Sequence, residues 1–205
     1  MVIRELKPSR QVPGRWLAAL EDGSLLRVGE DEVLRFGLYA GRELSDQEAQ
    51  ALTRSAERSG RRQRAMELAA GKPLSRRELE RKLSAWGADE EEQAAVCGRL
   101  EELGYLDDGA YAARVARHYW DRGYGRLKIQ DELYRRGVPR ELWDQALEGL
   151  GDPAAAIDAL LEKKLGGRDA DRKELQKVSA ALARRGYQWQ DISEALRRRG
   201  VQVED

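Results

Sequence analysis

The chain has 205 residues, and its 37 lysines and arginines are matched by 37 aspartates and glutamates, so the formal net charge is zero although 36% of the residues are charged. This balance excludes binding driven by bulk charge, because a histone-like nucleic-acid binder carries a basic excess and a solvating tail an acidic one. One cysteine and one histidine exclude an intramolecular disulfide and provide too few soft ligands for a zinc site, so we expect no metal, no cofactor and a reducing, cytoplasmic location.

Residues 1 to about 43 have the pattern of a small β-hairpin. The segments 16–20 and 24–28 flank Asp22-Gly23, where glycine tolerates the positive φ that a tight hairpin turn requires. The N-terminus lacks the apolar stretch of a signal peptide, and no apolar run approaches the ~18 residues of a membrane span. We therefore expect residues 1–60 to form an N-terminal extension with a hairpin and a helix, in a protein that does not contact a membrane.

Capping residues mark the helix starts beyond residue 44. In a capping box, a Ser or Asp side chain accepts a hydrogen bond from the third amide of the helix, and a Glu at that position reaches back to the cap. The pattern occurs at Ser45-x-x-Glu48, Ser75-x-x-Glu78, Asp89-x-x-Glu92 and Asp171-x-x-Glu174. Pro139 and Pro153 are predicted at first helical positions, where a missing N–H costs nothing.

The most informative feature is an internal repeat. Two apolar residues and a glycine recur with a spacing of four as Leu79-Leu83-Gly87, Ile129-Leu133-Gly137 and Val178-Leu182-Gly186. The apolar pair shares one helix face, and the glycine suits the left-handed residue that ends a helix. A second apolar pair follows each glycine at equal distance, as Val96-Cys97, Ala146-Leu147 and Ala195-Leu196.

A further helical pattern precedes each of these units, over residues 62–70, 108–122 and 152–165. The sequence therefore predicts an all-α fold of three tandem three-helix, helix-turn-helix-like repeats, over residues 61–106, 107–151 and 152–205. Because a unit of this size buries little surface alone, we expect an elongated, curved array, with the small β-hairpin as its N-terminal extension.

The glycine-rich segments of the sequence do not match the nucleotide-binding motifs of enzymes. Gly123-Tyr124-Gly125 lacks the later glycine of a dinucleotide fingerprint, and Gly71-Lys72 lacks the flanking residues of a phosphate loop. His118 and Cys97 are expected to pack in the core, and acidic runs at helix starts are explained by the helix dipole. We therefore expect a protein that is not an enzyme.

Basic doublets recur at the same place in the second and third units, as Arg135-Arg136 and Arg184-Arg185. Cations at this position complement the helix dipole, which is one explanation. The other is a spaced row of arginines that meets phosphates or acidic side chains of a partner. The candidate partner-binding residues are Arg126, Lys128, Arg135, Arg136, Lys177, Arg184 and Arg185.

Two stretches carry a resemblance to a known family. Leu100-Glu-Glu-Leu-Gly-Tyr-Leu-Asp-Asp108 with Tyr111-Ala112, and the run from Arg122 to Val138, resemble the RecX family of recombination regulators, as do 75–83 and 176–187. The resemblance covers residues 62–200, and Gly109 departs from it where a better helix former is expected. In this family motif Tyr105, Leu106, Asp107, Asp108 and Tyr111 are expected to be structural.

The resemblance implies a non-enzymatic regulator built of tandem three-helix repeats. Such a protein binds RecA and the RecA filament on single-stranded DNA, and represses strand exchange, ATP hydrolysis and co-protease activity. We expect it to act as a monomer, without a small-molecule substrate. The alternative is a sequence-independent DNA-binding helical-repeat protein that acts without a recombinase, which predicts tight binding to naked DNA with a steep salt dependence.

Overall fold

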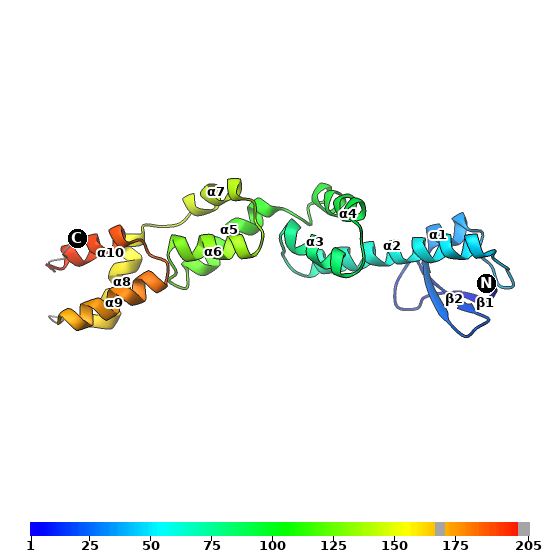
Figure 1. Cartoon of the computed structure of the whole chain (residues 1–205), viewed down its shortest axis with the longest axis horizontal. Helices are drawn as coiled ribbons and strands as arrows, with labels where there is room; N and C mark the ends of the chain where they lie inside the picture. Colours follow the sequence, from blue (N-terminus) through cyan, green and yellow to red (C-terminus); the bar gives the residue numbers. More distant parts are fainter. Residues whose placement is uncertain (167–170, 201–205) are drawn as a thin grey trace. The chain divides into compact units, whose positions relative to one another are not determined.

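The computed structural model describes residues 1–166 and 171–200 (Figure 1). The chain separates into two compact units. The first unit comprises residues 1–73 and 79–105, and the second comprises residues 74–78 with the described residues from Leu106 onward. None of the helices in these described ranges is long and apolar enough to cross a membrane.

The first unit begins with a three-stranded antiparallel sheet in the order β1-β2-β3. Its strands are β1 (Ile3–Pro8), β2 (Arg15–Leu20) and β3 (Leu25–Gly29). The predicted hairpin is confirmed as β2 and β3, with Gly23 at a φ of +83° in the turn. Strand β1 was not predicted, because only Ile3 of that strand is buried and its charged residues obscure the alternation typical of a strand.

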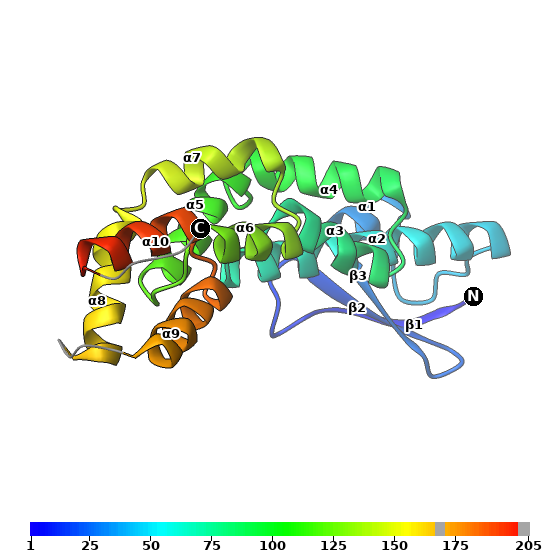
Figure 2. The same ribbon diagram turned by 60° about the vertical axis from the view of Figure 1, so that its left-hand side comes forward.

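Two helices cover one face of this sheet, α1 (Glu30–Arg35) and α2 (Asp46–Gly71) (Figure 2). A core that includes Ile3, Val28 and Leu52 joins them to the strands. Helix α2 begins at the predicted capping box of Ser45 and Glu48, and it contains the short helix predicted at 62–70. Helix α2 runs through residues 60 and 61 without a break, so the end of a helix does not mark the predicted domain boundary. The division into these domains stays a prediction.

Beyond α2, the described residues form helical elements in the predicted register. They are α3 (Arg76–Ala85), α4 (Glu90–Glu102), α5 (Asp108–Trp120), α6 (Arg126–Arg135), η1 (Arg140–Leu142), α7 (Trp143–Glu148), α8 (Pro153–Leu165), α9 (Arg172–Arg184) and α10 (Trp189–Arg198). Helices α5, α6 and α7 share one apolar core and α8, α9 and α10 another. The predicted third repeat also includes residues 167–170 and 201–205, which lie outside the described residues.

The register of the repeats is confirmed residue by residue. All of the predicted apolar pairs are buried: Leu79, Leu83, Val96, Cys97, Ile129, Leu133, Ala146, Leu147, Val178, Leu182, Ala195 and Leu196. The glycines that follow the second helices have φ values of +85°, +69° and +85° at Gly87, Gly137 and Gly186. The helical fold with a small N-terminal sheet is therefore as predicted, while the elongated, curved arrangement stays a prediction.

Two local predictions are wrong. Pro139 precedes the short 3₁₀ helix η1 and not an α-helix, which begins only at Trp143. His118 is exposed on α5, with its ring edge-on to Tyr119 at 5.5 Å, and is not packed in the core. The spacing of His118 from Val115 and Tyr111 places it at the margin of the apolar stripe of α5. At this margin a polar ring can turn to solvent.

Within the second unit, the second helices of successive repeats meet end to end. The backbone N–H groups of Gly125 and Leu127, at the start of α6, donate to the carbonyls of Arg185 and Gly186 at 2.8 and 3.0 Å. Gly125 has no side chain to cap α6, so the end of α9 satisfies amides that the helix itself leaves unpaired. At the equivalent position of the preceding repeat, the Ser75 hydroxyl donates to the carbonyl of Arg136.

Candidate partner-binding surface

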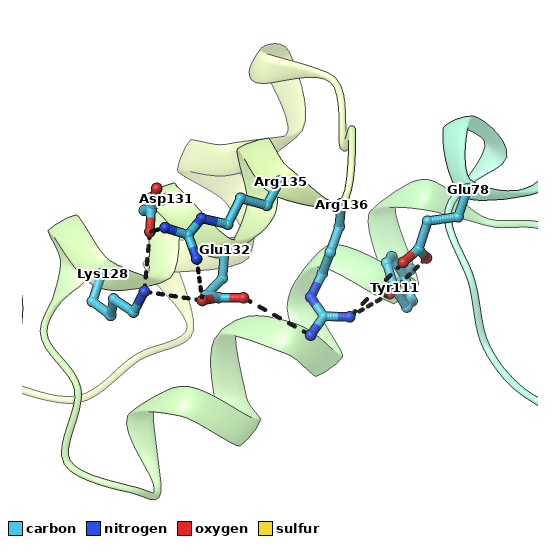
Figure 3. Close-up of polar contacts among 7 residues, drawn as sticks. All are labelled: Glu78, Tyr111, Lys128, Asp131, Glu132, Arg135 and Arg136. Carbon is cyan, nitrogen blue, oxygen red and sulfur yellow. Dashed lines mark hydrogen bonds and ion pairs between the residues drawn. The ribbon is translucent and has the colours of Figure 1, made fainter. Parts of the chain in front are cut away.

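Three of the predicted cations belong to an ion-pair network on and beside α6 (Figure 3). The Lys128 ammonium lies 3.0 Å from carboxylate oxygens of both Asp131 and Glu132, and an Arg135 guanidinium nitrogen lies 3.2 Å from Asp131. Residues three and four apart are neighbours on a helix surface, so these contacts follow from the spacing. The hydrogen bond from Lys128 lowers the pKa of Asp131. Lys128 and Arg135 therefore carry local counterions.

Arg136 has a different role, because it ties three segments together. Its Nη1 donates to the Tyr111 hydroxyl at 3.0 Å, and that hydroxyl donates to Glu78 Oε2 at 2.9 Å. Its Nη2 lies 3.9 Å from Glu132. Burial works to lower the pKa of Arg136, but hydrogen bonds to the hydroxyls of Tyr111 and Tyr119 raise it. Arg136 thus connects α5, the end of α6 and the segment 74–78.

The Tyr111 hydroxyl is expected to contribute measurably to stability. Replacing Tyr111 by phenylalanine removes a group that binds two charged partners, and hydrogen bonds to charged groups contribute about 1.5–3 kcal/mol. Urea unfolding of the Tyr111→Phe variant, followed by circular dichroism, should show a loss of this size.

Tyr187 is the matched control for that measurement. It is equally buried, but its hydroxyl has no hydrogen-bond partner among the residues that the structure describes. Tyr187→Phe should leave the free energy of unfolding unchanged or raise it by up to about 1 kcal/mol, because an unsatisfied buried hydroxyl is removed. Equal losses in the two variants would contradict the role of Tyr111 as a link between Glu78 and Arg136.

Arg185 is the counterpart of Arg136 in the third repeat. Its Nη1 donates to the carbonyl of Gly123 at 3.1 Å, and its guanidinium lies 5.7 Å from the centroid of the Tyr124 ring. It fastens the end of α9 to the loop before α6. In both doublets, therefore, the second arginine is bound within the fold. Only the first arginine of each doublet, Arg135 or Arg184, remains accessible for the predicted contact with a partner.

The remaining predicted cations are available to a partner. Lys177 and Arg184 are exposed on α9, and Arg126 is half-buried at the first residue of α6. None of these three side chains makes an ion pair with a residue in the described ranges. Arg135 is also accessible, with 63% of its side chain exposed. These four cations form the candidate partner-binding surface, and its role in binding stays a prediction.

The residues of the family motif lie around the start of α5. Asp107 is the N-cap of α5 and accepts a hydrogen bond from the Ala110 N–H at 2.8 Å. Asp108 accepts one from the Arg76 N–H at 2.8 Å. Leu106 and Tyr111 are buried, whereas Tyr105 is partly exposed at the end of the first unit. Helix α5 begins at Asp108 with Gly109 in its first turn.

Glu78, a member of the network, and Tyr119 beside it were not among the predicted site residues. Glu78 was expected only to complete a capping box, and it does bind the Ser75 N–H at 3.0 Å while also accepting from Tyr111. Tyr119 lies two turns after Tyr111 on α5 and packs, partly buried, against the core of the second repeat. The spacing of the two tyrosines was the available signal.

A small sheet followed by helix triplets in a repeated register defines a helical-repeat protein. Models of the second and third three-helix domains of RecX match residues 107–147 and 152–196. The chain is 37% identical over 132 residues to the regulatory protein RecX of Trichlorobacter lovleyi, covering 60% of this chain and 84% of that protein. Its identity to the RecX of Chlorobaculum tepidum is 37% over 132 residues, covering 62% and 79%.

The fold extends the similarity to the N-terminal part. A crystal structure of a regulatory protein RecX superposes with a TM-score of 0.70 at 21% sequence identity, and covers 95% of this chain and 98% of that one. The chain belongs to the RecX family of regulatory proteins.

Proposed function

We propose that the protein binds the RecA recombinase and its filament on single-stranded DNA, and inhibits the recombinase, ATPase and co-protease activities. It acts by binding, without chemistry of its own. The observation that carries this proposal is the match to both RecX three-helix domains over α5 to α10. The exposed cations of the candidate partner-binding surface support it, because they suit acidic side chains of a protein partner.

As mechanism, we propose contact with neighbouring recombinase protomers. The second and third repeats each present one accessible cation from the doublet, Arg135 and Arg184 respectively. The repeats are joined through helix ends, so the spacing between these cations is fixed by the backbone hydrogen bonds from Gly125 and Leu127. Contacts made at this spacing with successive protomers would slow extension of the filament or favour its disassembly.

The direct test adds the protein to RecA on single-stranded DNA and follows ATP hydrolysis and filament length. Both should fall as the protein is added. A variant with Arg126→Glu, Lys177→Glu and Arg184→Glu should require at least about tenfold more protein for half-inhibition, a loss of about 1.4 kcal/mol in binding. Lys164→Glu, an exposed charge reversal on α8, is the matched control and should inhibit as the unchanged protein does.

Co-sedimentation with and without DNA separates the two functions that the sequence leaves open. Binding to RecA that persists at moderate salt, with weak binding to naked DNA, supports a recombinase regulator. Tight binding to naked DNA with a steep salt dependence, and unchanged ATP hydrolysis at saturating protein, contradicts it in favour of a DNA-binding repeat protein.

A further inference from the structure

The second unit contains a groove of about 600 Å³ beside α6 that the ion-pair network does not fill. Its lining includes Arg77, Tyr134, Gly137, Val138, Arg140 and Trp143. A groove of this volume is large enough for one bulky side chain and part of the backbone that carries it. Its walls come from α6, from the η1–α7 segment of the same repeat and from Arg77 in the first turn of α3.

The groove is bordered by apolar surface that the fold leaves exposed. Tyr134 is 73% exposed, and Leu127, two turns earlier on the same face of α6, is 49% exposed. The opposite face of α6 buries Ile129 and Leu133 in the core, so Tyr134 and Leu127 are not needed for packing. Large exposed side chains gathered beside a concave surface are typical of an interaction site.

Trp143 and Arg140 supply the side-chain types that dominate binding energy at protein interfaces. The Trp143 indole N–H donates to the Val138 carbonyl at 3.0 Å, so its polar edge is satisfied and its ring position is fixed. The Arg140 guanidinium lies 5.6 Å from the Trp143 ring centroid and makes no ion pair with a residue that the structure describes. This prearranged cation is available for an anionic group.

The charge around the groove selects the kind of partner. Asp131 also lines the groove, but Lys128 and Arg135 already neutralise it at 3.0 and 3.2 Å. The other charged side chains in the lining are Arg77 and Arg140, so the groove favours an anionic group. Tyr134, Val138 and Trp143 supply apolar surface beside these cations, which suits a peptide that places an apolar side chain next to a carboxylate better than a strand with a phosphate at every nucleotide.

We propose that this groove binds an acidic peptide segment of a protein partner. A bulky apolar side chain of the segment packs against Tyr134 and Trp143, and a neighbouring carboxylate pairs with Arg140. The inference rests on the proposed function only for the identity of the partner as the recombinase. The chemistry of the groove is tested without it.

The test uses fluorescence anisotropy with the full chain and three labelled probes. They are a short peptide with a central Leu-Phe pair flanked by aspartates, the same peptide with lysines in place of the aspartates, and a short oligothymidylate. The acidic peptide should bind most tightly. Tyr134→Ala and Arg140→Glu should each weaken it by about tenfold or more. Trp189→Ala removes a comparably exposed aromatic side chain outside the groove and should leave the affinity unchanged.

The outcomes separate the groove from the proposed function. Equal affinity of the acidic peptide for the unchanged protein and for both groove variants overturns the inference. Preference for the oligothymidylate, lost in Tyr134→Ala, overturns it in favour of nucleic acid. If Tyr134→Ala loses the peptide but still inhibits RecA, the groove is supported for another partner and the proposed function stands. If the unchanged protein binds the peptide but never affects RecA, the groove stands and the proposed function fails.

Discussion

Replacing Gly125 by alanine is expected to separate the third repeat from the second. A Cβ atom at this position would collide with the backbone carbonyl of Gly186, which no side-chain rotation can relieve. The hydrogen bonds from Gly125 and Leu127 to the end of α9 would then be lost together. We expect a loss of about 3 kcal/mol in stability, at the upper end of the range for overpacking. Urea unfolding and hydrogen exchange of the Leu127 amide measure it.

Gly98→Ala provides the control for that substitution. Gly98 lies inside α4, and a Cβ atom there would meet no other atom within 4 Å. Alanine should stabilise the helix by about 0.5–1 kcal/mol, because glycine is the poorer helix former. A Gly125→Ala variant that is as stable as Gly98→Ala, with unchanged protection of the Leu127 amide, would contradict the end-to-end contact.

The second large effect is expected at the buried ion pair of the first unit. Glu92 on α4 is only 4% exposed at its side chain, and Arg61 on α2 donates to both carboxylate oxygens at 2.9 and 2.7 Å. Arg61→Met removes both hydrogen bonds and leaves Arg58 at 3.9 Å as the remaining cation. Stranding a buried charge in this way costs about 3–5 kcal/mol, which urea unfolding should detect.

Arg99→Met is the control, because it breaks an ion pair of similar length in solvent. Arg99 and Glu102 lie 2.8 Å apart with 65% and 68% of their side chains exposed. An exposed pair contributes at most about 1 kcal/mol. The double variant Arg61→Met with Glu92→Met should recover most of the stability, because no charge is left buried. Equal losses for Arg61→Met and Arg99→Met would show that the burial of Glu92 is not decisive.

The sequence predicted those parts of the fold that local patterns specify. The buried pairs and the following glycines depend on helical periodicity and on φ, which neighbouring residues determine, and they are in place in all three repeats. The capping residues Ser45, Asp89 and Asp171 also accept the predicted hydrogen bonds. Glu92 was expected to reach back to its cap, but it turns instead to Arg61, a residue on another helix that no local pattern reveals.

The candidate surface was predicted less completely, for a geometric reason. Adjacent residues on a helix project about 100° apart, so a doublet cannot present both of its cations to the same side. Arg135 and Arg184 are exposed, while Arg136 and Arg185 bind Tyr111 and the Gly123 carbonyl. Which member turns inward depends on segments distant in the sequence, α5 for Arg136 and the loop before α6 for Arg185, so the sequence identified the positions without distinguishing their roles.

Helix α9 differs from α6 at its first turn, and this difference limits how many repeats can be joined. In the repeat register, the position held by Ser75 and Gly125 falls in the third repeat on Glu174, inside α9. The Glu174 N–H is already bound by the Asp171 carboxylate at 2.7 Å. If the end of another helix packed here, its carbonyls would face the Asp171 carboxylate, and the Glu174 N–H would not be free to donate to them. The end-to-end contacts between second helices therefore run in one direction and end at α9. A tandem duplication of the third repeat should add a domain without extending this series of contacts.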